Sequence, residues 1–119
     1  MTDDTKIMLF KIEYLKKLLK KSLRVSSTAH EILFKDSFDK QNQLIAATYL
    51  NKAISLISEA KAIYISNIEQ LERSEVKEIF HCFDVFESEF LNNLSTNHSH
   101  QWTDIEFVKF KESIENFIQ

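Results

Sequence analysis

The sequence contains neither glycine nor proline. Average usage would supply about eight glycines and about six prolines in a chain of 119 residues. Their absence removes the residues that usually occupy positive-φ turn positions, tight hairpins and helix C-caps. A β-rich fold with many tight turns is hard to build without them, whereas helices need few turns and asparagine can take the cap position. The asparagines near expected helix ends are Asn42, Asn92, Asn93 and Asn97.

Paired cysteines, a signal peptide and a long apolar run are also missing from the sequence. Cys82 is the single cysteine, and small secreted domains normally carry paired ones. The first four residues are acidic where a signal peptide is basic. The uncharged stretch of residues 41–51 is too short and too polar to span a bilayer. We therefore expect one cytoplasmic domain over residues 1–119, with no membrane contact.

Charge is distributed unevenly along the chain, whose net charge is −3. Residues 1–40 carry nine Lys/Arg against six Asp/Glu, and residues 41–119 carry six against twelve. A net negative chain has no general attraction for nucleic acid, so nucleic acid is not an expected partner. Two differently solvated sides of one domain account for this asymmetry.

Residues 5–35 have helical periodicity with one interruption. The apolar positions that step by three or four are Met8, Ile12, Leu15, Leu19 and Leu23. Ser26, Ser27 and Thr28 weaken this pattern, and Thr28 with Glu31 matches a capping box. The first helix is therefore either broken near Ser26–Thr28 or continuous to Lys35, and the apolar positions after residue 28 favour continuity.

Residues 41–71 hold the most regular pattern in the chain. Ala46, Ala53 and Ala60 are spaced by seven and interleave with larger residues at the same spacing. This wide apolar seam predicts the central helix of a bundle. A part of the seam left uncovered by other helices would allow a homodimer through Ala46, Ala53 and Ala60.

Two further amphipathic segments follow. Ser74 is a plausible N-cap for a phenylalanine-rich helix over residues 74–94, and Thr103 with Glu106 forms a second capping box before a C-terminal helix. Four amphipathic helices with short connections predict an all-α fold, namely an antiparallel up-down bundle of four main helices.

Potential metal ligands are concentrated in one polar loop. His98, His100 and Asp104 could bind Zn²⁺ or another transition metal, although a polar loop that happens to hold two histidines explains the same residues. His81 and Cys82 are adjacent in the third helix, so their side chains diverge by about 100° and do not form a catalytic pair. No cofactor is expected.

The third helix carries an acidic set that could bind a partner. Its members are Glu75, Glu78, Asp84, Glu87 and Glu89. An acidic helical surface favours a basic partner such as a toxin or a nuclease, because charge complementarity speeds association and selects the partner. We therefore expect a non-enzymatic protein–protein interaction module, such as a bacterial or phage immunity protein, antitoxin or inhibitor. The alternative is a metal-binding or enzymatic bundle that uses the His98, His100 and Asp104 cluster.

Overall fold

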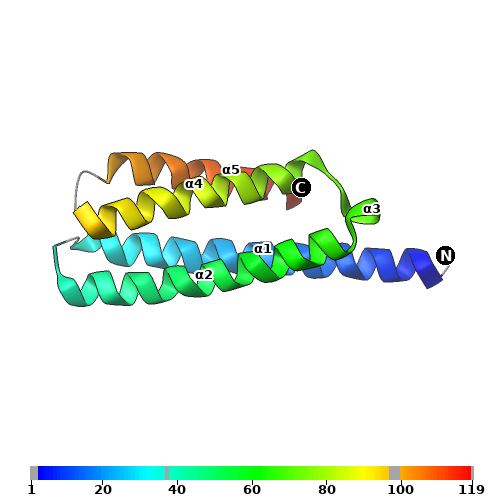
Figure 1. The fold of residues 1–119 in the computed structure, drawn as a ribbon, viewed down its shortest axis with the longest axis horizontal. Coiled ribbons are helices and arrows are strands. Elements are labelled where there is room, and N and C mark those ends of the chain that lie inside the picture. The colour runs from blue at the N-terminus through cyan, green and yellow to red at the C-terminus, as the bar shows by residue number, and fades with distance from the viewer. Residues whose placement is uncertain (1–2, 37, 97–99, 119) are drawn as a thin grey trace.

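The computed structural model describes residues 3–36, 38–96 and 100–118, and these residues form helices without any strand. The helices are α1 (Asp3–Lys35), α2 (Lys40–Ser66), α3 (Ile68–Leu71), α4 (Ser74–Thr96) and α5 (Gln101–Ile118). The four long helices alternate in direction along an axis of 55 Å, and α3 is a single turn between α2 and α4 (Figure 1). The prediction of an all-α antiparallel bundle is confirmed.

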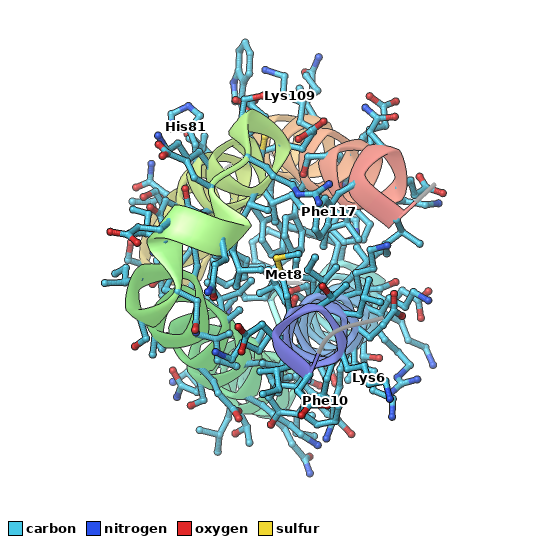
Figure 2. The ribbon with its side chains drawn as sticks, turned by 90° about the vertical axis from the view of Figure 1, so that its right-hand side faces the viewer. Lys6, Met8, Phe10, His81, Lys109 and Phe117 are labelled. Carbon is cyan, nitrogen blue, oxygen red and sulfur yellow. The ribbon has the colours of Figure 1, made fainter. Side chains whose placement is uncertain are left out.

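The bundle consists of two helical hairpins, α1–α2 and α4–α5, stacked on each other. Viewed down the long axis, the four long helices stand at the corners of a square, with α1 beside α2 and α5, and α2 beside α4 (Figure 2). The prediction that residues 41–71 form the central helix is wrong, because α2 ends at Ser66 and occupies a corner. Its wide apolar surface serves two neighbours, α1 and α4.

The core is dominated by phenylalanines that α4 and α5 direct between the hairpins. Phe83, Phe86, Phe90 and Phe110 are each at most 1% exposed. The Phe86 and Phe110 rings stack with centroids 6.1 Å apart, and Phe83 meets Phe110 edge-on. Aromatic pairs in these arrangements stabilise a core beyond the area that they bury.

Helix α1 runs without a break through the segment that contains serines and a threonine. Ser22 and Ser26 are fully buried, and the Ser22 hydroxyl donates to the Leu19 carbonyl at 2.7 Å. The Thr28 hydroxyl donates to the Arg24 carbonyl at 3.1 Å. These hydroxyls bond to the preceding turn within the helix, so the capping box predicted at Thr28 is wrong and the predicted continuity to Lys35 is confirmed.

The helix caps differ from those that the sequence predicts. Asp39 caps α2, since its carboxylate accepts from the backbone N–H groups of Gln41 at 2.8 Å and Asn42 at 3.1 Å. Thr103 lies buried inside the first turn of α5, where its hydroxyl donates to the Asn93 side chain and to the Glu89 carbonyl. The second predicted capping box is therefore also wrong.

The expected asparagine caps are not found in the described part of the chain. Asn42, Asn92 and Asn93 lie within helices, and Asn97 lies outside the described residues. Asn67 is the C-cap of α2 instead, with a φ of −130°, which is not the left-handed conformation. Its side chain donates to the Ile63 carbonyl and accepts from the Lys11 ammonium at 2.6 Å.

Small residues line the contact between α1 and α2. Ala46, Ala53 and Ala60 of α2 are all 0% exposed, and α1 contributes the buried Ser22, Ser26 and Ala29 to the core. Small residues allow two helix backbones to approach closely. Because α1 already covers the alanine seam, the predicted homodimer through Ala46, Ala53 and Ala60 is corrected: the folded chain does not offer these residues to a second copy.

None of the described helices is both long enough and apolar enough to cross a membrane.

Candidate functional site

The acidic residues of α4 divide into two groups that point toward different neighbours. Asp84 accepts a hydrogen bond from the Lys61 ammonium of α2 at 3.2 Å. Glu75 and Glu78, by contrast, line a hollow with Ser113 and other residues of α5. The five predicted residues therefore do not form one continuous acidic face.

The group toward α5 lies in a groove between α4 and α5. One hollow of about 330 Å³ is lined by Ser74, Glu75, Glu78, Ser113 and Asn116. The next hollow, of about 230 Å³, shares Glu78 and adds Cys82, Lys109 and Glu112. We call these two hollows the acidic groove. In the described part of the chain, no cation pairs with Glu75, Glu78 or Glu112, and Lys109 pairs with Glu106 at 3.2 Å.

Cys82 forms part of the wall of the acidic groove but is not a ready nucleophile. Its thiol donates to the Glu78 carboxylate at 3.3 Å. Burial raises the pKa of the Cys82 thiol to about 11, with further contributions from the Glu78 hydrogen bond and negative charge. The thiolate is the reactive form of cysteine, so the neutral thiol at physiological pH has low reactivity. His81 points outward from α4 (Figure 2), away from the buried Cys82.

The group toward α2 comprises Asp84 and Glu87. Burial raises the pKa of the Glu87 carboxyl, the nearby Asp84 charge raises it further, and the Lys61 ammonium opposes both effects. Lys61 also lies 5.8 Å from the centre of the Phe80 ring. Asp84 therefore links α4 to α2 through Lys61, whereas no ion pair of Glu87 is found among the described residues. Glu89, the fifth predicted residue, is half-buried, and its backbone carbonyl accepts the Thr103 hydroxyl.

The predicted metal cluster is partly assembled, with an unexpected member. His100 Nδ1 lies 2.8 Å from one Asp104 carboxylate oxygen, and His30 Nε2 lies 2.7 Å from the other. His98 lies outside the described residues. Within those residues, no group of three potential ligands is placed to hold a metal ion. His30 comes from α1, 74 positions away, so sequence spacing gave no signal for it.

Aromatic rings surround this histidine–aspartate contact. His30 stacks on Phe107 with ring centroids 4.8 Å apart and meets Phe34 edge-on at 5.0 Å. Phe34 also contacts the His100 ring at 4.6 Å. The cluster therefore joins α1 to the N-terminal turn of α5, where it positions the two hairpins.

A second groove, between α1 and α2, was missed by the sequence-based prediction. A hollow of about 540 Å³ is lined by Tyr14, Lys17, Leu18, Lys20, Lys21, Arg24, Leu56 and Glu59. We call this hollow the basic groove. A neighbouring hollow of about 410 Å³ extends it along α1 to Phe10, which is 71% exposed and stacks on Tyr14. The sequence pattern of α1 alone does not predict this groove, because the contribution of α2 is not visible in it.

Tyr14 ties the two sides of the basic groove together. Its hydroxyl donates to the Glu59 carboxylate of α2 at 2.8 Å. This hydrogen bond and the Glu59 charge raise the pKa of Tyr14. Among the described residues, no carboxylate pairs with Lys17, Lys20, Lys21 or Arg24, so their charge faces solvent.

Comparison with known proteins finds no matching family model, no matching curated protein and no matching solved structure.

Proposed function

We propose that this chain is a non-enzymatic protein-binding module whose acidic groove receives a basic segment of another protein. One observation carries the proposal: Glu75 and Glu78 lie side by side in an open groove, with no cation of the described residues paired to them. Unpaired carboxylates in a concave surface attract Lys and Arg side chains and speed association with a basic partner. The specific form of the proposal is an immunity or antitoxin-like protein, or an inhibitor, that blocks a basic toxin or nuclease.

Two charge-reversal variants test which acidic group binds. E75K/E78K reverses the acidic groove, and D84K/E87K makes the same charge change on the side of α4 that faces α2. Each variant and the wild type serve as bait in a pull-down from the native host. We expect the captured basic protein to be lost with E75K/E78K and retained with D84K/E87K.

Salt dependence provides the second readout on any captured complex. Exposed charge pairs are screened because the Debye length is about 8 Å at physiological ionic strength, so affinity should fall as salt rises. Circular dichroism of each variant checks that the bundle is folded. Binding that is independent of salt, or that survives E75K/E78K, would contradict the proposal.

A metal-binding or enzymatic site at His98, His100 and Asp104 is the second candidate, favoured by the convergence of His30 and His100 on Asp104. Elemental analysis of the purified chain tests it directly. A bound metal ion stabilises the folded state and raises the melting temperature. Absence of metal, together with a melting temperature that Zn²⁺ does not change, would rule this candidate out.

A further inference from the structure

On the outer side of the α1–α2 hairpin, the exposed side chains near the turn differ in character from those farther along the long axis. Near the turn between the two helices, Ile45 and Tyr49 are 38% and 36% exposed. Their spacing places them on the same stripe of α2 as Leu56, which lines the basic groove. Farther along, Lys20 and Lys21 supply positive charge to this groove. The surface therefore changes from apolar to basic along its length.

The outer side of α5 changes from apolar to acidic in the same direction. Trp102, Ile105 and Val108 are 60%, 37% and 48% exposed, and Glu112 and Glu115 follow as exposed residues. Successive members are three or four positions apart and therefore adjacent on the helix surface, and the first and last, Trp102 and Glu115, lie about 140° apart around the axis. Helices α2 and α5 run in the same direction (Figure 1).

The axial levels of these two surfaces coincide. The His30–Asp104 contact places residue 104 level with residue 30, and Lys16 lies 5.8 Å from the Phe117 ring centre, which places residue 117 level with residue 16. Because α1 and α5 are antiparallel, Glu112 and Glu115 then lie between these levels, beside those of Lys20 and Lys21. The acidic end of the α5 stripe thus has the same height in the bundle as the basic groove.

The apolar ends also share a level. The Tyr14–Glu59 hydrogen bond aligns α1 with α2. Because α1 and α2 are antiparallel, counting ten residues from this pair toward the α1–α2 loop places Tyr49 near the level of Arg24. Ile45 lies one helical turn closer to the loop. Ile105 and Val108 occupy these same heights on α5. A sideways displacement without any axial shift would therefore bring apolar residues onto apolar ones and carboxylates onto cations.

One chain cannot make these contacts with itself. The outer sides of α5 and of the α1–α2 pair lie at opposite edges of the end view (Figure 2). We propose that copies of this chain associate side by side with parallel long axes, the outer stripe of α5 in one copy lying in the outer groove of the α1–α2 hairpin in the next. Such a heterologous contact produces a ring or an open row of copies. The two proposals share Glu112, which also lines the acidic groove, whereas Glu75 and Glu78 take no part in this contact.

Sedimentation velocity of the full chain over a wide concentration range tests the proposal. We expect the average mass to rise above 14.0 kDa with concentration and to fall back in high salt. Trp102 is the single tryptophan, so its fluorescence should shift to shorter wavelength in parallel as association buries the indole.

Charge reversal on each side identifies the surfaces. K20E/K21E changes the groove and E112K/E115K changes α5, and each should weaken self-association about tenfold or more. An equimolar mixture of the two variants should associate again, because each supplies one intact side of the contact. K35E/K40E makes the same charge change near the turn and should associate like the wild type. Circular dichroism confirms that every variant is folded.

Three results would overturn the proposal. The first is a wild-type chain that remains monomeric at every concentration. The second is self-association that both reversals leave unchanged, which would place the contact elsewhere. The third is loss of association in both variants without recovery in their mixture, since complementary charges would then not explain the contact.

Discussion

The Cys82 thiol lies at the contact between α4 and α5 and is 7% exposed. Its pKa is raised from 9.0 to about 11, which lowers the thiolate fraction at pH 8 about 100-fold. We expect iodoacetamide to alkylate the native chain about 100-fold more slowly than the urea-unfolded chain at pH 8. Mass spectrometry of timed samples measures both rates. Equal rates in the two states would show that Cys82 is accessible and that its pKa is not raised.

Glu87 is expected to destabilise the fold when it is ionised. Its pKa is raised in the folded chain, by burial first and by Asp84 second, so the folded state holds this proton more tightly than the unfolded state does. Protonated Glu87 therefore stabilises the folded state at low pH. This stabilisation is lost as pH rises from 4.5, the pKa of Glu87 in the unfolded chain, through its higher pKa in the folded chain.

Substitution of Glu87 by glutamine tests this sign. E87Q should raise Tm relative to the wild type at pH 7 and should give no gain at about pH 4, where Glu87 is largely protonated. Thermal melts followed by circular dichroism at the two pH values measure the difference. E75Q, at an exposed position of the same helix, is the matched control. A lower Tm for E87Q at pH 7 would mean that attraction to Lys61 outweighs the cost of burial.

At the scale of the helices, the alanine seam of α2 that the sequence predicts is fully buried in the structure. Ala53 is 0% exposed within it, so a larger side chain has no space without displacing α1. We expect A53L to lower the free energy of unfolding by about 1–3 kcal/mol, as overpacking does in well-filled cores. Urea denaturation measures the change. A62L places the same side chain on the exposed side of α2 and should change stability by no more than about 0.5 kcal/mol.

The long helices could be predicted from sequence because their apolar periodicity extends over many turns. Their ends were harder to place, since a capping box is defined by residue type and spacing alone. Thr28 and Thr103 satisfy that pattern, yet their hydroxyls bond to a preceding turn and to α4, respectively. The sequence did not predict that α2 occupies one corner of the four-helix bundle. A wide apolar surface indicates that a helix has several neighbours but not how these neighbours are arranged around it.

The candidate surfaces were less predictable than the helices. The acidic set was correctly placed on one helix, but its division depended on which neighbour each side chain faces, and Lys61 of α2 settles that for Asp84. The basic groove and the His30–Asp104 contact each combine residues from two helices. Such sites arise from packing, and a single chain without related sequences carries no pattern that links their parts.

At the scale of the whole molecule, polar contacts among the described residues connect the hairpins on opposite sides of the aromatic core, and two of them can be compared directly. His30 bonds to Asp104 between α1 and α5, and Lys61 bonds to Asp84 between α2 and α4. The two contacts differ in their surroundings: the His30 side chain is 20% exposed and stacked on Phe107, whereas those of Lys61 and Asp84 are 36% and 57% exposed. Solvent therefore screens the second pair more strongly than the first.

Double-mutant cycles measure what each contact contributes to holding the hairpins together. For alanine substitutions we expect a coupling of about 1–2 kcal/mol between His30 and Asp104, because His30 is largely shielded from water. For Lys61 and Asp84 we expect less than about 0.5 kcal/mol, as for exposed ion pairs. The cycle subtracts the separate loss of the His100–Asp104 contact, which each Asp104 variant shares. Couplings near zero for both pairs would show that the aromatic core alone aligns the hairpins. A larger coupling for Lys61 and Asp84 would instead make the side between α2 and α4 the main polar connection.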